Sequence, residues 1–156
     1  MITVRREHTL CPVLPVSRCT DLLPARRVAD ARQARRRLTG RRRWRIERVR
    51  QDTLDDALVA LFELHQARWH ARSHPGVLGG KDVRRFLSCV ARGLLDRGML
   101  RVYTLRIDER IVCVHYGFQD SRRRFFYIAG FDPALKSLSI GTVLLEQAIR
   151  DACAKA

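Results

Sequence analysis

The sequence predicts an α+β domain in which helices flank a mixed, mainly antiparallel sheet. The chain has 156 residues, of which 46% are hydrophobic, and this is enough for one compact domain with its own core. Between residues 100 and 131 the apolar residues alternate in three runs joined by short polar connections, which is typical of an antiparallel meander. Before and after this segment they recur at helical spacing, so helices precede and follow the three strands.

The N-terminal part of the chain is predicted to hold an irregular segment and then a basic helix. Residues 1–24 contain three prolines and little periodicity, so we expect a lead-in or a linker remnant before a domain over residues 25–156. The Arg-rich run that follows carries small or apolar residues at helical spacing: Val28, Ala31, Ala34 and Leu38. This spacing predicts a helix that ends at Gly40. Its arginines form either a solvated helix face or a phosphate-binding stripe.

A short strand and two helices are predicted next. The strand is indicated by apolar residues separated by polar ones: Trp44, Ile46 and Val49. A helix then begins at Asp52–Thr53, and its apolar stripe consists of Leu58, Leu61, Phe62, His65 and Trp69. After a glycine-rich loop, a second helix begins near Asp82 and stops at Gly98. Its apolar residues are Val83, Phe86, Leu87, Val90, Leu94 and Leu95.

The alternating segment and one more helix complete the order of elements. The three runs are LRVYTLRI from Leu100, IVCVHYGFQ from Ile111 and RFFYIAGF from Arg124. A loop follows, and the last helix extends from Gly141 to about Ala154 with apolar residues along one side. The segment after the basic helix therefore reads as strand, two helices, three antiparallel strands, loop and helix.

The charge of the chain points to an anionic partner, although its composition weakens that inference. There are 31 Lys and Arg residues against 16 Asp and Glu, which gives a formal net charge of +15. Only three of the basic residues are lysines, and this preference for Arg is typical of GC-rich genomes. We therefore do not expect nucleic acid as the main partner. The alternative is a protein that binds nucleic acid or an acidic polymer through Arg26–Arg50.

No segment of the sequence predicts export or membrane insertion. The N-terminus has no apolar run of signal-peptide length, and no stretch approaches the roughly 18 to 20 apolar residues of a membrane span. We therefore expect a soluble, cytoplasmic protein.

Metal binding is not predicted, and two residues are candidates for proton transfer. His65 and His70 lie five positions apart, whereas helical zinc ligands need a spacing of three or four and a third ligand. His115 and Tyr127 lie on neighbouring strands, where each could line a cleft and move a proton. The alternative for both is a half-buried polar side chain with one hydrogen bond.

The loop FDPALKSLSIGT between the last strand and the last helix could hold a phosphate. A helix N-terminus offers unpaired backbone N–H groups and a partial positive charge, which suit a pyrophosphate. The residues around it are small, and a lysine adds a cation: Lys136, Ser137, Ser139, Gly141 and Thr142. The loop lacks the G-K-[ST] of a Walker loop and the three glycines of a dinucleotide fingerprint. Taken alone, it is either a phosphate cradle or an ordinary turn.

The element order and this loop together resemble the GNAT superfamily of acyl-CoA N-acyltransferases. The segment Lys136–Gly141 is similar to the family pattern [QR]-x-x-G-x-[GA], from which Lys136 and Ser139 depart. The resemblance implies transfer of an acyl group from acetyl-CoA or another acyl-CoA to an amine acceptor. It also implies cofactor binding, largely through the backbone, by Phe131, Lys136, Ser137, Ser139, Gly141 and Thr142.

Several motifs resemble one branch of that superfamily, the CelD-like and FemAB-related proteins. The motifs include CPVLP, LFELHQARW, HPGV, LLDRGMLRVYTLRIDERIV and GFDPALKSLSIGTVLLEQAI, which occur in the order and spacing of the branch. This resemblance implies a link to the biosynthesis of cell-envelope polysaccharides such as cellulose.

The resemblance also leads us to expect an incomplete domain. Members of the family continue past the third helix into further strands and another helix, whereas this chain stops at Ala156. We therefore expect a truncated domain of reduced or no activity, with an unpaired edge along residues 124–131 that a protein partner could cover. The remaining alternative is a non-functional gene fragment.

Overall fold

A computed structural model describes residues 25–40, 43–71 and 73–154, and every structural statement below concerns these residues. The lead-in expected over residues 1–24 lies outside them. The helices are α2 (Ala25–Thr39), α3 (Leu54–His70), α4 (Lys81–Asp96) and α5 (Ile140–Cys153), with short 3-10 helices η2 (Gln51–Thr53) and η3 (Pro133–Leu138). The strands are β1 (Trp44–Arg48), β2 (Leu100–Ile107), β3 (Arg110–Gln119) and β4 (Arg124–Phe131).

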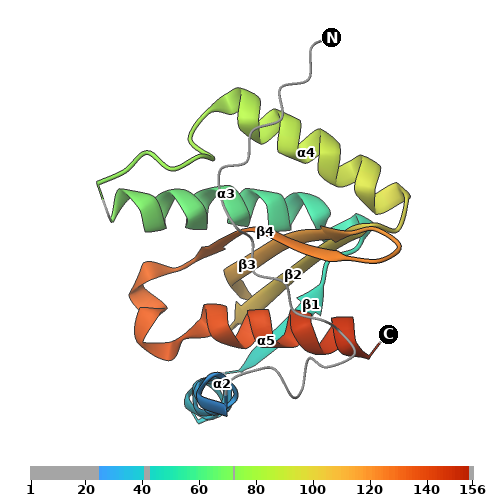
Figure 1. Ribbon diagram of the computed structural model, residues 1–156. Coiled ribbons are helices and arrows are strands. Elements are labelled where there is room, and N and C mark those ends of the chain that lie inside the picture. Colours follow the sequence, from blue (N-terminus) through green and yellow to red (C-terminus); the bar gives the residue numbers. More distant parts are fainter. Residues whose placement is uncertain (1–24, 41–42, 72, 155–156) are drawn as a thin grey trace.

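The four strands form one antiparallel sheet in the order β1-β2-β3-β4. The sheet lies between two helical layers, with α3 and α4 on one face and α2 and α5 on the other (Figure 1). The register shifts at Leu105/Arg106 on β2 and at Tyr116/Gly117 on β3, which marks a local irregularity in each ladder. The predicted α+β fold, a mainly antiparallel sheet flanked by helices, is confirmed.

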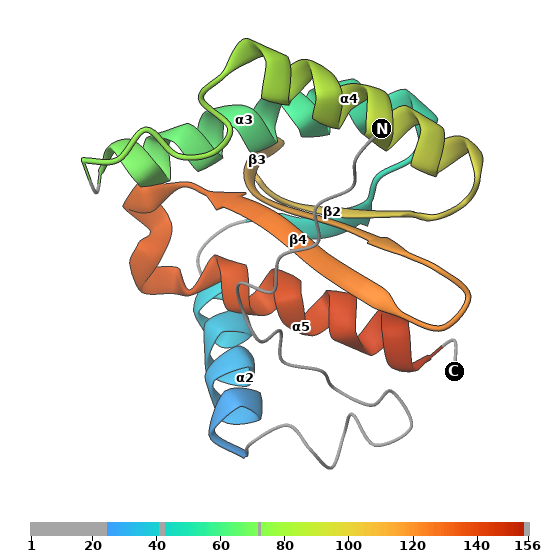
Figure 2. The same ribbon diagram turned by 45° about the horizontal axis from the view of Figure 1, so that its top comes forward.

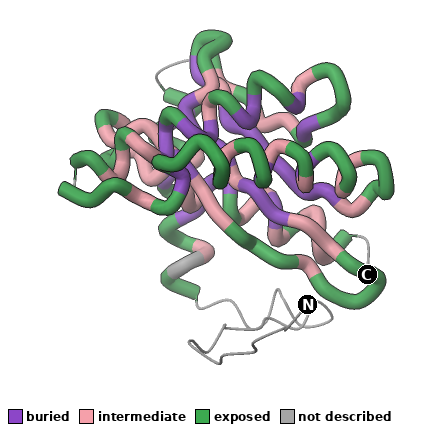
Figure 3. The backbone as a smooth tube through the Cα atoms, turned by 90° about the horizontal axis from the view of Figure 1, so that it is seen from above, coloured by how far each residue is buried: buried purple, intermediate pink, exposed green. Residues whose placement is uncertain are grey.

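Two hydrophobic clusters, one on each face of the sheet, make up the core. The first lies under α3 and α4 and contains Leu58, Leu61, Val102, Val114 and Tyr116 among others. The second lies under α2 and α5 and contains Leu38, Leu105, Cys113, Val143 and Leu144 among others. In Figure 3 the buried segments run through the middle of the molecule, and exposed segments surround them.

The basic helix α2 packs through the apolar stripe that the sequence predicted. Ala31, Ala34 and Leu38 are each 2% exposed. On the side toward α5, Arg35 pairs with Glu146, with 2.6 Å between Nε and Oε2. Arg35 of α2 thus contacts α5, whereas other arginines of the helix, such as Arg32 and Arg36, face solvent.

The helix α4 differs from its prediction, because two residues of its expected apolar stripe point to solvent. Phe86 is 66% exposed and Val83 is 43% exposed. Only Leu87 and Ala91 of this helix are buried, so α4 contacts the rest of the protein along a narrow line. The spacing of the apolar residues identified the helix but overestimated the width of its buried face.

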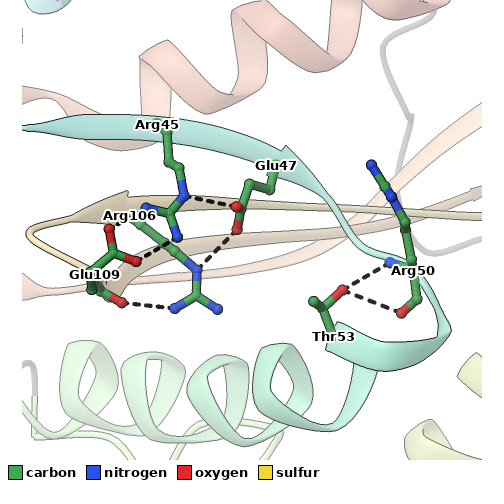
Figure 4. A network of polar contacts seen from close by, with 6 residues as sticks. All are labelled: Arg45, Glu47, Arg50, Thr53, Arg106 and Glu109. Carbon is green, nitrogen blue, oxygen red and sulfur yellow. Dashed lines mark hydrogen bonds and ion pairs between the residues drawn. The ribbon is translucent and has the colours of Figure 1, made fainter.

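Charged residues tie β1 to the turn between β2 and β3 (Figure 4). Arg45 pairs with Glu109, and its Nε lies 2.7 Å from Oε1 of Glu47. Arg106 donates from Nε to Oε2 of Glu47 at 3.0 Å. The hydrogen bond from Arg45 is the main cause that lowers the pKa of both carboxyl groups, so they are ionised at neutral pH.

Candidate functional site

The loop after β4 is shaped by a chain of local signals. Asp132 Oδ1 accepts a hydrogen bond from Ala134 N at 3.0 Å, and Pro133 occupies the first position of η3. At the end of η3, Ser139 has φ 53° and ψ 37°, which is the left-handed region. This single residue turns the chain so that α5 can begin at Ile140.

The N-terminus of α5 leaves backbone donors available. Thr142 N and Val143 N donate to Ser139 O at 3.0 and 3.4 Å, so the helix supplies no acceptor for the two amides before them, those of Ile140 and Gly141. A Cβ built on Gly141 would have no atom within 4 Å. The packing of the protein therefore does not require glycine here, and the space beside this backbone is open.

Lys136 and Arg37 bring positive charge to the η3 part of this loop, and the sequence analysis identified only Lys136. Lys136 and Ser137 are exposed on η3. Arg37 of α2 donates from Nη1 to Ser137 O at 3.1 Å, which brings a second positive charge to the loop. Nothing in the Arg-rich run distinguishes Arg37 from its neighbours, because only the packing of α2 beside α5 selects it.

The end of β4 that leads into the loop is an open sheet edge. Asp132 N donates to Val112 O at 2.9 Å. Because backbone groups alternate along a strand, those of Phe131 and Ala129 are directed away from β3. The sheet order places no described strand on that side of β4. A ligand could therefore form hydrogen bonds with the backbone of these two residues.

Arg68 of α3 is a charged side chain at this end of β4, and it was not a sequence candidate. Its guanidinium carbon lies 4.9 Å from the ring centroid of Phe131. Its Nε is buried and has no hydrogen-bond partner in the described part of the chain. A buried donor without a partner is costly, so an acceptor on a ligand that displaced the atoms around this nitrogen would satisfy it.

The structure places the two proton-transfer candidates on opposite faces of the sheet. His115 stacks on Phe126 with ring centroids 4.9 Å apart, and burial lowers its pKa to about 4, so it is neutral at pH 7. Tyr127 is 63% exposed and contacts Tyr116, which belongs to the core under α3 and α4. The two side chains do not converge on one site. Of the two, His115 lies nearer the loop end of the hairpin, because its partner on β4 is Ala129, two residues beyond Tyr127.

Cys113 and His65, two further reactive side chains in the described part of the chain, are both buried. Burial raises the pKa of Cys113 to about 12, so its thiol stays protonated. His65 is 2% exposed, and burial, followed by the charges of Arg68 and Arg84, lowers its pKa. In the residues that the structure describes, no group of three His, Cys, Asp or Glu side chains could hold a metal ion.

Comparison with known families assigns this fold. A model of the acetyltransferase (GNAT) domain family matches residues 25–156. The chain belongs to this family. No curated protein matches it. None of the described helices has the length and apolar character that a membrane span requires.

Solved structures share the fold at low sequence identity. The aminoglycoside acetyltransferase meta-AAC0020 from an uncultured soil metagenomic sample, in complex with sisomicin, is 17% identical with a TM-score of 0.51, over 72% of this chain and 71% of that chain. Its complex with trehalose gives 15% identity and a TM-score of 0.50 over the same shares. The C-terminal domain (DUF2156) of a protein named as a lysylphosphatidylglycerol synthetase, from Agrobacterium fabrum, is 16% identical with a TM-score of 0.54, over 87% of this chain and 40% of that chain.

The family also gives a reading of Ser139. The GNAT loop pattern has a glycine at the position that Ser139 occupies, and the φ of Ser139 is the left-handed value that glycine adopts without a steric cost. Ser139 therefore has a backbone conformation that a glycine at this position would adopt without strain.

Proposed function

We propose that this GNAT domain is an acyl-CoA-dependent N-acyltransferase that uses the β4 edge and the loop after it as the acyl-CoA site. The proposal rests on three features that follow one another along the chain from β4 to α5. They are the outward backbone groups of Ala129 and Phe131, the left-handed Ser139, and the open N-terminus of α5. A long ligand with a peptide-like arm and a pyrophosphate fits this order along one line.

The pyrophosphate would lie at the N-terminus of α5. The amide of Gly141 supplies a donor there, since Ile140 is only 1% exposed, and the helix dipole favours negative charge. Thr142 lies in the first turn of the same helix, and Lys136 and Arg37 add cations beside it. Ser137 and Ser139 complete this binding loop through their backbone.

The reactive end of the ligand would lie beside Phe131. The arm pairs with the backbone of the β4 edge, and a polypeptide strand from a protein partner on the outer side would enclose it. Arg68 Nε then donates to the thioester carbonyl, whose oxygen gains negative charge as the amine attacks. His115, neutral at pH 7, is the nearer candidate to accept a proton from the amine, and Tyr127 is the second.

The acceptor is proposed from charge and from the resemblance to the CelD-like branch. The aminoglycoside acetyltransferase meta-AAC0020 was solved in complex with sisomicin, and aminoglycosides are polycationic amines. A net charge of +15 repels a polycation, so a neutral or anionic amine fits this chain better. The CelD-like resemblance supports an amino sugar of cell-envelope polysaccharide synthesis as that acceptor.

Titration calorimetry of the full chain with acetyl-CoA tests the cofactor site. We expect wild-type binding that the Gly141→Glu variant weakens at least tenfold, because a carboxylate enters the space next to the pyrophosphate donors. The matched control is Gly93→Glu, since Gly93 on α4 is equally free of neighbours within 4 Å. The proposal is wrong if acetyl-CoA at millimolar concentration does not bind, or if both variants lose affinity equally.

A further inference from the structure

The tip of the β3–β4 hairpin carries three consecutive exposed aromatic residues. Phe125 is 37% exposed, Phe126 is 45% exposed and Tyr127 is 63% exposed. We call these residues, with the preceding Arg122 and Arg123, the aromatic tip. Figure 2 shows this end of the hairpin, in orange, reaching the rim of the molecule between α4 and α5. Such a contiguous exposed apolar patch marks an interaction surface.

The three aromatic side chains occupy both faces of the hairpin. Phe125 stacks on Phe118 with ring centroids 4.9 Å apart, and Phe126 stacks on His115 at the same separation. Since Phe118 and His115 lie on opposite faces of β3, the tip is apolar above and below the sheet. A flat partner would contact one of these faces, whereas a medium that surrounds the tip contacts both.

The turn beside the aromatic residues is fixed by hydrogen bonds to Asp120 and carries two arginines. Asp120 Oδ1 accepts hydrogen bonds from the backbone N–H groups of Arg122 and Arg123, at 2.7 and 2.6 Å. The side chains of both arginines are exposed, and no ion pair holds them within the described part of the chain. Gln119 N, at the end of β3, donates to Met99 O at 2.8 Å, so the chain just after α4 lies beside the hairpin turn. Arg97, at the end of α4, is therefore a third exposed arginine at this end of the sheet.

We propose that the aromatic tip inserts into the headgroup region of an anionic lipid bilayer. Phe and Tyr side chains are stable at the boundary between headgroups and acyl chains, and Arg122 and Arg123 would pair with lipid phosphates there. The bilayer surface surrounds the tip, so it covers the aromatic residues on both faces of the hairpin. It also complements a chain with a net charge of +15.

Other occupants fit these observations less well. A second copy of the chain would bring another +15 to the same surface, and this repulsion opposes pairing. A single-stranded nucleic acid complements the charge, but its bases would stack on the aromatic residues of one face only. The turn of the hairpin lies away from the proposed pyrophosphate loop, because six residues of extended strand, roughly 20 Å, separate Phe125 from Phe131. The two proton-transfer candidates, Tyr127 and the His115 that stacks on Phe126, lie between them.

Co-sedimentation of the full chain with vesicles tests the proposal. We expect the protein to pellet with phosphatidylcholine vesicles that contain phosphatidylglycerol, and not with phosphatidylcholine alone. The F125S/F126S/Y127S variant should lower the partition coefficient at least tenfold, and R122Q/R123Q should lower it about tenfold. Circular dichroism of each variant confirms that it is folded.

Matched variants separate the tip from general effects of charge and apolar exposure. R32Q/R36Q removes two exposed arginines from α2, and Phe86→Ser removes an exposed phenyl ring from α4. Both should bind vesicles nearly as well as the wild type. A Tyr127→Trp variant should show a blue-shifted emission on anionic vesicles, and Phe86→Trp should not.

Four results would overturn the proposal. They are a wild type that does not pellet, a loss of binding as large in R32Q/R36Q as in the tip variants, a concentration-dependent dimer that only the tip variants abolish, and tighter binding to oligo(dT) than to vesicles that is lost with the three aromatic residues. The third result identifies a second copy as the occupant, and the fourth identifies nucleic acid.

Discussion

The two ends of β4 differ in what surrounds them. At the loop end, Gly130 is buried so closely against α3 that an added Cβ would lie 2.7 Å from His65 N and 3.0 Å from Leu61 O. At the hairpin end, three aromatic residues face solvent, and Tyr127 is 63% exposed. One strand of eight residues therefore passes from an end whose face is sealed by α3 to an end whose faces are open to solvent, and its backbone edge is not covered by another described strand at either end.

The difference follows from where the helices cross the sheet rather than from the composition of the strand. The residues RFFYIAGF are apolar at every position but the first. Helix α3 packs against the loop end, where Gly130 allows its backbone to approach, and leaves the hairpin end uncovered. An apolar residue on an edge strand is thus part of the core only where a helix lies over it.

The largest effect is expected at the sealed end. Gly130→Ala should lower the free energy of unfolding by about 3 kcal/mol, because its Cβ would overlap backbone atoms of α3 that cannot rotate away. Urea denaturation followed by circular dichroism measures this change. Gly93→Ala is the control, since its Cβ meets nothing and alanine favours the helix, so its stability should not fall. A Gly130→Ala protein as stable as the wild type would mean that this end is not sealed.

A smaller effect is expected in the middle of the hairpin, where His115 stacks on Phe126. Burial lowers the folded-state pKa of His115 from the ordinary 6.5 to about 4. Between pH 4 and pH 6.5 the unfolded chain binds more protons at His115 than the folded protein does. The contribution of His115 to stability is therefore complete above about pH 6.5 and is lost as the pH falls toward 4. We expect the titration of His115 to lower the free energy of unfolding by about 2 kcal/mol over this pH range. This is less than a fully buried histidine would give, because the side chain is partly exposed.

Denaturation at pH 4.5 and 7.0 checks this value. The His115→Phe variant should show a smaller loss between the two pH values than the wild type, and the exposed His74→Gln should show the wild-type loss. An unchanged pH dependence in His115→Phe would assign the effect to other groups, of which His65 has its pKa lowered in the same direction.

The smallest effect is expected at the open end. Tyr127→Ser should change the free energy of unfolding by less than about 1 kcal/mol, because its side chain already lies mostly in water. Leu144→Ala in α5 is the contrasting variant: Leu144 is fully buried, and its truncation should cost about 3 kcal/mol. If Tyr127→Ser lowers the free energy of unfolding as much as Leu144→Ala does, Tyr127 is part of the core. The proposal that the aromatic tip is free to bind a partner would then be wrong.

The element order and most of the helical faces could be read from the sequence. Alternation identified the meander, and helical spacing identified α2, α3 and α5, because the period of apolar residues reflects local backbone geometry. The stripe of Ala31, Ala34 and Leu38 is buried as predicted. The spacing failed for Phe86 on α4, since periodicity shows which face is apolar but not how much of it another element covers.

The candidate site was only partly visible in the sequence. Lys136 and Gly141 were selected because they lie in one loop that leads into a helix, which is a local pattern, and Phe131 was selected from the GNAT resemblance. Arg37 reaches the loop from α2 and Arg68 reaches the end of β4 from α3, at large sequence separations, so only packing could select them from 31 basic residues.

The sequence by itself determined the fold class, the order of elements and the position of the loop, because these depend on local periodicity and turn chemistry. Tertiary structure decided which arginines meet that loop, that His115 and Tyr127 lie on opposite faces, and that β4 is sealed at one end and open at the other. These outcomes depend on where α2 and α3 cross the sheet, and helix placement is set by the packing of the whole core rather than by any one segment.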